Sequence, residues 1–477
     1  MCVLKTFLEV VKPLLIYNST RFLKEKNING KLENNLKKKL DRLQKCSIGR
    51  ELGLEHGKKI DDLPLTGYSF YQRFYNDPHE GDFMYPLNDY FKNMTSGTMS
   101  KPKVYLTPKI FLNKVIMNAG LSIFFISTFD GEKYHFKFGD TLYLNIPGGS
   151  FISNIASKEV NKNRSSLIKV VPPDSENMTF QEKVDYFVEH YKEIDLAQMN
   201  ITTLLDDIEP RIKEKVKLKS FITMDASAFE LKERVKDFIG TYPKTPYCST
   251  ETIASTIPSI DPPAGFFFDW RLIYPEFIPE KYAITHEVER IDELPEIISL
   301  KDVEIGGRYQ LVITPFYSEL TRSVTSDILE CIGFEDKLLK VETPIFRFYS
   351  RADRILSLHN FTRINETEIV MVLEASKIPF VDFTARRELD DTKEYLRLYV
   401  EFKDDVDLDE TTKILHETFM ATDKDYRDLT NMMEYTPIRL SILTKGTFKN
   451  FFSKKEGMSR IARIGMREDR LKLLLEA

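Results

Sequence analysis

The chain has 477 residues, enough for two or three domains, and its 42% hydrophobic and 30% charged residues exclude a globally disordered protein. A net charge of −5 gives no general reason to expect nucleic acid as a partner. Four cysteines lie far apart without a C-x-x-C pair, which argues against a disulfide framework or a zinc site and favours a reducing compartment.

The N-terminal segment MCVLKTFLEVVKPLLIYN is apolar but does not fit a signal peptide, because Glu9 and Lys12 interrupt it and no small-residue cleavage site follows. It predicts an amphipathic helix that ends near Pro13. No window of the sequence approaches the roughly 18 uninterrupted apolar residues of a membrane span. We therefore expect a soluble, cytoplasmic protein without a membrane partner.

The first 350 residues alternate helical and strand patterns. Lysine-rich stretches such as NNLKKKLDRLQKC predict solvated helices with a thin apolar stripe, and PKIFLNKVIMNAGLSIFFI has the length of a buried helix. The segment TLYLNIPGG is typical of a strand that leads into a glycine turn. Thr179 and Glu182 form a capping box that predicts a helix start. A strand over Leu218–Met224 and a helix from about Ala228 to Phe238 complete an α/β pattern.

The pattern changes beyond Ser350. FVDFTARREL and EYLRLYVEF are adjacent strand candidates, DETTKILHETFMATDKDYRDLTNMM is helical, and PIRLSIL is another strand. We therefore expect a large α/β N-terminal domain with mixed sheets and helices over residues 1–350. A small α+β C-terminal domain is expected over residues 351–477.

A polar loop, TSGTMSKPK, spans Thr95 to Lys103 between an aromatic run and an apolar one. Its hydroxyl side chains and backbone N–H groups can meet phosphate oxygens while a lysine neutralises their charge. It is not a Walker A loop, which requires a second glycine and a hydroxyl residue after the lysine. A Ser/Thr/Gly turn between two elements is the alternative.

Two later segments add the groups that a nucleotide site needs. In Tyr247–Glu251 an aromatic ring can stack on a purine, hydroxyls can meet phosphate and Glu251 can hold Mg²⁺, although such a turn is often structural. The stretch Gly306–Glu330 predicts an alternating strand, a turn and a short run that ends in Asp327. An acidic residue just past a strand end is placed to bind both ribose hydroxyls, or else it caps a turn or helix.

In this order the segments resemble motifs of the acyl-adenylate-forming superfamily. The loop matches T-S-G-T-T-G-x-P-K except at Met99 and Ser100, and YCSTE is similar to Y-G-x-T-E. The stretch GGRYQLVIT with LTRSVTSD, the sequence YPEFIP and the run SRADRILSLHNFTRINETEI resemble one family within it, the auxin-responsive-type acyl acid amido synthetases of plants and their microbial relatives. KGTF, from Lys445, fits a p-G-T-F element of microbial members. The similarity runs from about residue 45 to residue 465. This set of motifs in matching order is more specific than any single motif.

The resemblance implies an adenylate-forming enzyme-like fold and an ATP-dependent ligase. A carboxylic acid would attack the α-phosphate of ATP to give an acyl-adenylate and pyrophosphate, with Mg²⁺ as cofactor. The small domain would then rotate, and an amine, usually an amino acid, would displace AMP to form an amide. An acyl-CoA ligase with a thiol acceptor and a non-catalytic nucleotide- or acyl-ligand-binding descendant are the alternatives.

The resemblance also assigns residues. Positions implied to bind the nucleotide are Thr95, Ser96, Thr98, Lys103, Tyr247, Ser249, Thr250, Asp327 and Arg351. Glu251 is implied to hold Mg²⁺ and to be catalytic together with Arg460, and Asp353 is implied to mark the hinge.

Several positions depart from the family pattern. Val324 and Ser326 replace its second arginine and the glycine before the ribose-binding aspartate, and Arg460 replaces a small-domain lysine. Arginine keeps the charge but not the compact ammonium, so Arg460 is either catalytic or a surface cation of a basic tail. Arg363 or Lys445 can take the lysine's role instead. The aromatic run GFFFDW either lines the acyl pocket or belongs to the core.

Overall fold

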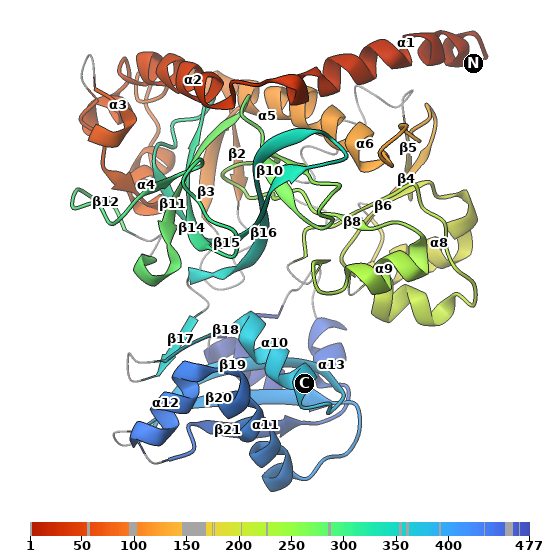
Figure 1. The fold of residues 1–477 in the computed structure, drawn as a ribbon, viewed down its shortest axis with the longest axis vertical. Coiled ribbons are helices and arrows are strands. Elements are labelled where there is room, and N and C mark those ends of the chain that lie inside the picture. Colours follow the sequence, from red (N-terminus) through yellow and green to blue (C-terminus); the bar gives the residue numbers. More distant parts are fainter. Residues whose placement is uncertain are drawn as a thin grey trace. The chain divides into compact units, whose positions relative to one another are not determined.

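The computed structural model describes two compact units (Figure 1), one that ends at Tyr349 and one that begins at Ser350. The described residues are 2–54, 58–94, 103–145, 168–173, 175, 177–201, 203–225, 228–284, 288–352, 355–358, 362–390, 393–433, 435–453, 461–466 and 468–477.

The N-terminal unit contains a mixed sheet with the strand order β13-β11-β14-β15-β16-β10-β9, to which β1 and β12 add at the side. These strands are β1 (Leu65–Thr66), β9 (Thr256–Pro258), β10 (Phe266–Phe268), β11 (Ile273–Pro279), β12 (Arg290–Ile291), β13 (Ile298–Ser299), β14 (Arg308–Pro315), β15 (Ser323–Asp336) and β16 (Val341–Arg351).

Strand β14 does not show the burial alternation that its sequence predicts. Tyr309, Leu311 and Ile313 pack into the main hydrophobic core, and Val312 packs on the opposite side with Leu65. Both faces of the strand are therefore buried, which removes the apolar-in, polar-out contrast of a half-exposed sheet.

A second sheet in the same unit is parallel, with the order β5-β4-β6-β7-β8. Its strands are β4 (Thr141–Leu144), β5 (Lys169–Val171), β6 (Leu196–Gln198), β7 (Ser220–Ile222) and β8 (Pro243–Lys244). Parallel strands need long connections, and α8 (Phe180–His190) and α9 (Lys232–Ile239) lie between them in sequence. The capping box is confirmed, because Thr179 and Glu182 bond reciprocally at the start of α8. Helix α9 begins four residues later than expected, at Lys232 instead of Ala228.

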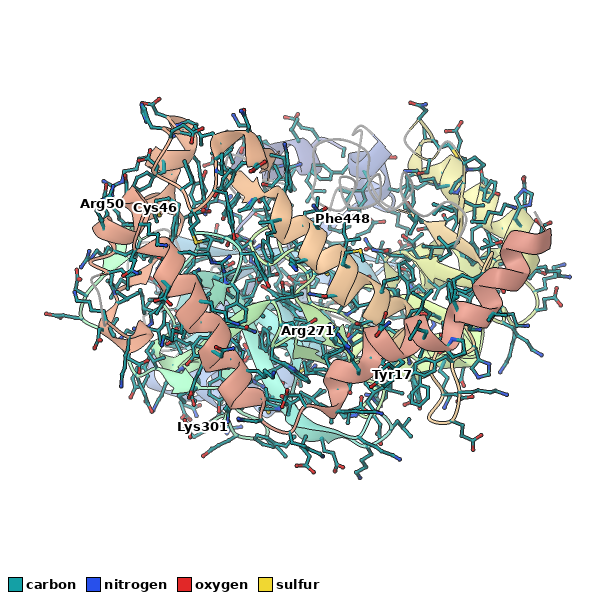
Figure 2. All side chains as sticks on the ribbon, turned by 90° about the horizontal axis from the view of Figure 1, so that it is seen from above. Tyr17, Cys46, Arg50, Arg271, Lys301 and Phe448 are labelled. Carbon is teal, nitrogen blue, oxygen red and sulfur yellow. The ribbon has the colours of Figure 1, made fainter. Side chains whose placement is uncertain are left out.

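The remaining helices of this unit are α1 (Cys2–Thr20), α2 (Ile28–Leu43), α3 (Ser47–Glu51), α4 (Tyr68–Asn76), α5 (Lys109–Val115) and α6 (Leu121–Ser127). Figure 2 looks onto α1 and α2, with Tyr17 on α1. The expectation that the first helix ends near Pro13 is wrong. A proline inside a helix costs roughly 3 kcal/mol. Leu15 and Ile16, which follow Pro13, pack against the hydrophobic cluster that contains Phe125, and the burial of their apolar surface offsets part of this cost.

The segment Lys109–Ser127 has the length and apolarity of a membrane span, contrary to expectation. It comprises α5, α6 and one π-helical stretch, Ile116–Gly120, between them. Half of its apolar window is buried within the protein, and Phe111 and Ile126 belong to the main core. One such helix that packs into a core is weak evidence for a membrane span.

Helix α2 has the expected apolar stripe of Leu32, Leu36, Leu40 and Leu43, but one of its lysines is not solvated. Lys39 has no exposed surface, and its Nζ donates to the carbonyl oxygens of Pro315 at 2.9 Å and of Leu320. Desolvation lowers its pKa to about 7, and the charge of the nearby Glu319 acts in the opposite direction. The lysine therefore ties α2 to the connection between β14 and β15.

The lowered pKa of Lys39 predicts a pH-dependent stability. Unfolded lysine keeps its proton up to its ordinary pKa of 10.5, whereas folded Lys39 loses it above about 7. The free energy of unfolding should therefore rise with pH above 7, by up to about 1.4 kcal/mol per pH unit. This pH dependence can be measured by urea unfolding at several pH values, monitored by the fluorescence of Trp270, the single tryptophan, which is buried.

Two variants of α2 isolate this contribution. Lys39→Met should remove the rise in stability between pH 7 and 9, whereas Lys38→Met, at an exposed neighbouring position, should retain it. Equal slopes in the two variants would show that Lys39 keeps its proton in the folded state.

The C-terminal unit has the α+β architecture expected from the sequence. Strand β19 (Phe380–Asp390) pairs antiparallel with β20 (Lys393–Phe402), and β20 pairs parallel with β21 (Ile438–Leu443). A two-stranded sheet, β17 (Ile355–Leu358) and β18 (Thr362–Asn365), precedes them. The helices are α10 (Glu366–Ala375), α11 (Leu408–Thr422), α12 (Lys424–Met433), α13 (Thr447–Ser453) and α14 (Glu468–Leu475).

Candidate nucleotide site

The polar loop of the first motif connects two paired strands, β2 (Tyr90–Met94) and β3 (Val104–Pro108). Thr95, Ser96 and Thr98 lie outside the described residues. Lys103 directly precedes β3, and its Nζ lies 5.0 Å from the ring centre of Tyr68.

Helix α4 fixes the start of β3 through one side chain. The Tyr68 hydroxyl donates to the Val104 carbonyl oxygen at 3.1 Å and accepts from the Val104 N–H at 3.0 Å. The backbone that follows the loop is thereby held at a defined position.

The second motif forms a tight turn after β8. Ser249 and Ile253 exchange two backbone hydrogen bonds of 3.2 and 2.8 Å, and Ile253 has a φ of 60°. The Ser249 hydroxyl lies 3.0 Å from that of Thr252 and accepts from its N–H. Ser249 therefore closes the turn, while Thr250 and Glu251 stand within it, partly exposed.

Asp327 does not lie just past a strand end, as expected, but inside β15. The pairs Val312–Val324 and Gln310–Ile328 leave one residue on β14 between them and three on β15, residues 325–327. Such a bulge redirects side chains next to functional sites. Asp327 is thus presented by an irregularity within a strand, because the extra residues break the regular pleat.

Ser326 fills the glycine position of the family motif without backbone strain. Among the described residues with positive φ, the non-glycine ones are Ile253, Ala264, Arg322, Lys340 and Lys377. A side chain is therefore tolerated at position 326.

Two tyrosine hydroxyls connect the three motifs. Tyr105, on β3, donates to Oε1 of Glu251 at 2.7 Å. Tyr247 donates to Oδ2 of Asp327 at 2.5 Å. The strand after the polar loop therefore touches the second motif, and the second motif touches the third.

Both tyrosines remain protonated donors at neutral pH. Burial raises the pKa of Tyr105 and that of Tyr247 well above 10, and the facing carboxylates, Glu251 and Asp327, raise them further. The site therefore presents two carboxylates, each with a fixed hydroxyl donor.

Glu251 fits a magnesium site of the kind completed by a substrate. Its carboxylate is partly exposed, and Mg²⁺ is usually held by one or two carboxylates together with substrate phosphates and water. No group of three or more His, Cys, Asp or Glu side chains with metal-binding geometry occurs among the described residues. The protein thus offers a partial ligand set.

Arg322, in the family's arginine-rich run, is structural. It is 1% exposed and binds the Glu276 carboxylate through Nη2 at 2.8 Å and Nε at 3.2 Å. Its Nη1 donates to the Leu63 carbonyl at 2.7 Å. Val324, in place of the second arginine, packs with Leu65 in a small apolar cluster.

Most of the residues assigned to the C-terminal unit lie outside the part of the chain that the structure describes. Asp353 and Arg460 lie outside the described residues, as does the side chain of Arg363. Arg351 is the last residue of β16 and is partly exposed. Lys445 forms an exposed ion pair with Asp405 at 2.8 Å.

Arg463, at the later arginine of the small-domain run, is held in ion pairs. Its Nε contacts Asp382 at 2.7 Å, and its Nη1 contacts Glu366 at 3.4 Å. Both partners belong to the C-terminal unit, so the pairs anchor the segment after the basic tail within that unit.

The aromatic run GFFFDW is core. Phe266, Phe267, Phe268 and Trp270 are each at most 3% exposed. The Phe266 ring stacks on that of Tyr247 with centroids 5.6 Å apart and an interplanar angle of 23°. The run therefore packs against the second motif through Phe266.

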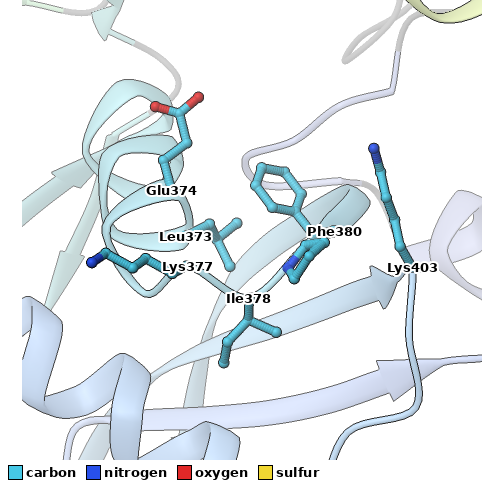
Figure 3. A pocket seen from close by; sticks show the side chains of 7 residues that line it. Leu373, Glu374, Lys377, Ile378, Phe380 and Lys403 are labelled. Atoms are coloured by element: carbon cyan, nitrogen blue, oxygen red, sulfur yellow. The ribbon is translucent and has the colours of Figure 1, made fainter.

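The C-terminal unit has an open groove of about 330 Å³, and Figure 3 shows the side chains that line it. It lies where α10 leads into β19, and its lining residues are Leu373, Glu374, Lys377, Ile378, Pro379, Phe380 and Lys403. None of the residues assigned from the motifs lines it.

Sequence reasoning missed Tyr105. It stands two residues after Lys103, at the second position of β3. Its closeness to the polar loop was the available signal. The motif of the loop ends at Lys103, however, and does not indicate a tyrosine that reaches Glu251.

Comparisons with known proteins agree with the motifs. Residues 266–351 match the GH3 family central domain, and residues 365–460 match the GH3 family C-terminal domain. An indole-3-acetic acid-amido synthetase, GH3.3 of Arabidopsis thaliana, is 34% identical over 107 residues, which are 22% of this chain and 16% of that protein. A probable indole-3-acetic acid-amido synthetase, GH3.11 of Oryza sativa subsp. japonica, is 28% identical over 140 residues, which are 28% of this chain and 22% of that protein. The matches thus span less than a quarter of these relatives' length.

Solved structures show the same fold over nearly the whole chain. The GH3.15 acyl acid amido synthetase in complex with 2,4-DB is similar with a TM-score of 0.67 at 15% identity, over 96% of this chain and 94% of that one. A 2-hydroxyisobutyryl-CoA ligase in complex with 2-HIB-AMP is similar with a TM-score of 0.59 at 12% identity, over 95% of this chain and 91% of that one. The expected adenylate-forming fold is confirmed. Residues 266–351 and 365–460 thus match, in sequence order, the central and C-terminal domains of the GH3 family, the auxin-responsive-type acyl acid amido synthetases that the motifs indicate.

Proposed function

We propose that this protein is an ATP-dependent ligase that activates a carboxylic acid as an acyl-adenylate and transfers the acyl group to an amine, most simply an amino acid. The observation that carries the proposal is the pair of hydrogen bonds from Tyr105 to Glu251 and from Tyr247 to Asp327. Within the N-terminal unit they connect three segments that are far apart in sequence: strand β3, which follows the polar loop, the second motif with Glu251, and the third motif with Asp327.

The reaction needs positioning and charge neutralisation more than a nucleophilic side chain. In the proposal, Asp327 accepts hydrogen bonds from ribose hydroxyls, and Lys103 with Thr95, Ser96 and Thr98 contacts phosphate. Glu251 holds Mg²⁺, which, when bound, offsets negative charge on the phosphate oxygens. Ser249 and Thr250 face the nucleotide.

We further propose that the C-terminal unit moves between the two half-reactions, since they require different surroundings of the adenylate. Arg351 and Asp353 would lie at the hinge, and Arg460 would bring a positive charge to the adenylate. The partly buried ion pairs of Arg463 fit this role, because they attach the segment that follows Arg460 to the C-terminal unit.

We propose a cytoplasmic location because the described cysteines are free thiols. Cys46, Cys248 and Cys331 are free thiols, and burial raises the pKa of the Cys248 thiol to about 12. Thiols of this kind suit a reducing compartment.

Asp327→Ala tests the nucleotide site. Loss of hydrogen bonds to a carboxylate, about 1.5–3 kcal/mol, should weaken ATP binding about 10- to 100-fold in calorimetry. Asp237→Ala, at an exposed position of α9, should leave the affinity unchanged. Wild-type affinity in the Asp327 variant would contradict the ribose assignment.

Pyrophosphate release over a panel of carboxylic acids, with amino acids or CoA as acceptors, tests the reaction itself. We expect release with at least one acid and a product whose mass is that of an amide. A thioester product would favour an acyl-CoA ligase, a function that the fold of the 2-hydroxyisobutyryl-CoA ligase also carries. ATP binding without any release would favour a non-catalytic binding protein, consistent with the departures at Val324, Ser326 and Arg460.

A further inference from the structure

Helix α1 is apolar on two opposite sides, and only one of them is covered. Leu15 and Ile16 pack against a hydrophobic cluster of the N-terminal unit. On the other side, Val10, Leu14 and Tyr17 are 74%, 59% and 52% exposed. Their spacing of four and three residues places them on one helical face, which we call the α1 face. A helix that is apolar all round is normally buried on every side, so this open face points to a partner.

The residues that follow α1 form a basic surface. The chain as a whole has a net charge of −5, but in residues 21–50, all of which the structure describes, exposed cations outnumber exposed acids. The exposed cations are Arg21, Lys24, Lys26, Lys31, Lys37, Lys38, Lys45 and Arg50, and the exposed acids are Glu33 and Asp41. The Nζ of Lys24 lies 5.5 Å from the ring centre of Tyr17, and Figure 2 shows α1 and α2 on the same side of the N-terminal unit. The α1 face therefore adjoins a surface of positive charge.

This combination fits an anionic lipid surface. Amphipathic helices that bind such surfaces bury an apolar face at the boundary between headgroups and acyl chains, while neighbouring lysines and arginines attract the lipid charge. Tyrosine is enriched at that boundary. A nucleic acid would meet the cations but leave the α1 face open. A second copy of this chain would cover the α1 face but bring its own cations against these.

We propose that the N-terminal unit docks on an anionic membrane surface, with the α1 face in the headgroup region and the cations of residues 21–50 near the lipid phosphates. The cytoplasmic leaflet of a cell membrane is anionic, so this agrees with the proposed cytoplasmic location. The expectation of no membrane partner rested on the lack of a spanning segment, which docking on the surface does not require. The inference does not depend on the proposed ligase activity.

Sedimentation of the full chain with lipid vesicles tests it. Vesicles of phosphatidylcholine with phosphatidylserine should bind the protein about tenfold or more tightly than vesicles of phosphatidylcholine alone, and salt should weaken the binding. Leu14→Asp places a charge in the α1 face and should reduce binding about tenfold or more. Lys37→Glu with Lys38→Glu should reduce it about 25-fold, at roughly fivefold for each basic residue lost.

Two matched controls carry the same changes elsewhere. Leu473, on α14, is 54% exposed, so Leu473→Asp should bind vesicles like the wild type. Lys213→Glu with Lys215→Glu, at exposed positions of the N-terminal unit, should also leave binding unchanged. If these controls weaken binding as much as the variants of α1 and α2, overall charge and hydrophobicity explain the binding, and the inference is wrong.

Two other results would identify a different occupant. A wild type that is dimeric in analytical ultracentrifugation and does not bind phosphatidylserine vesicles, with a monomeric Leu14→Asp variant, would show that a second copy covers the α1 face. Binding of a short double-stranded DNA that is lost in Lys37→Glu with Lys38→Glu, without vesicle binding, would show a nucleic-acid surface. Either result overturns the inference, as does equal binding of the wild type to the two kinds of vesicle.

Discussion

Glu251→Ala should reduce Mg²⁺-dependent ATP–pyrophosphate exchange by about a thousandfold or more. A metal that neutralises phosphate charge contributes several kcal/mol to the transition state, and each 1.36 kcal/mol is a factor of ten in rate. Glu251 is the carboxylate of the second motif, and Tyr105 orients one of its oxygens. Exchange of labelled pyrophosphate into ATP, measured over a range of Mg²⁺ concentrations, gives the result.

Two further variants sharpen this experiment. Glu251→Gln keeps the shape and the acceptor for Tyr105 but loses the charge, so it should be nearly as impaired as the alanine variant. Tyr105→Phe should keep most of the activity, because the metal-binding charge remains. Exchange at the wild-type rate in Glu251→Ala would remove this residue from the site.

The largest effect on stability is expected from the buried ion pair of Arg322 and Glu276, which are 1% and 3% exposed. Glu276→Leu leaves the arginine charge buried without its counter-charge, and such losses cost about 3–5 kcal/mol. The midpoint of urea unfolding, followed by Trp270 fluorescence, should fall accordingly. Trp270 lies in the same hydrophobic core as Phe277, the neighbour of Glu276 on β11.

A surface pair of similar geometry provides the comparison. Arg290 binds Asp292 through Nε at 2.8 Å and Nη2 at 2.7 Å, and both side chains are exposed. Asp292→Leu should therefore cost less than about 1 kcal/mol. The double variant Glu276→Leu with Arg322→Met should recover part of the stability lost by Glu276→Leu alone, since it removes both charges. Equal costs for Glu276→Leu and Asp292→Leu would show that burial adds nothing to this pair.

Features set by neighbouring residues were predictable from the sequence. The capping box of Thr179 and Glu182 requires only a spacing of three, and the strands β19 and β20 are adjacent in the chain. The polar turns of the motifs were visible because short segments carry their chemistry. Each of these predictions uses information that lies within a few residues.

Features that depend on contacts between distant segments were not predictable. Lys39 looks like its exposed neighbour Lys38 until the end of β14 and the connection that follows it supply two carbonyl oxygens, those of Pro315 and Leu320. The helix continues through Pro13 because residues more than 100 positions away cover its second half. Strand β15 continues past Asp327 because the residues on both sides of it pair with β14, with a bulge between the two paired stretches. The sequence of β15 alone does not encode this pairing.

The bulge in β15 has a consequence for how this chain can vary. Side chains along a strand alternate between opposite faces, so one residue inserted or deleted between Val324 and Ile328 would turn every later side chain of β15 over relative to β14. Leu329 would then leave the core, in which it has no exposed surface. The length of this short segment should therefore tolerate change less than the identity of its residues, as the replacement of glycine by Ser326 already illustrates.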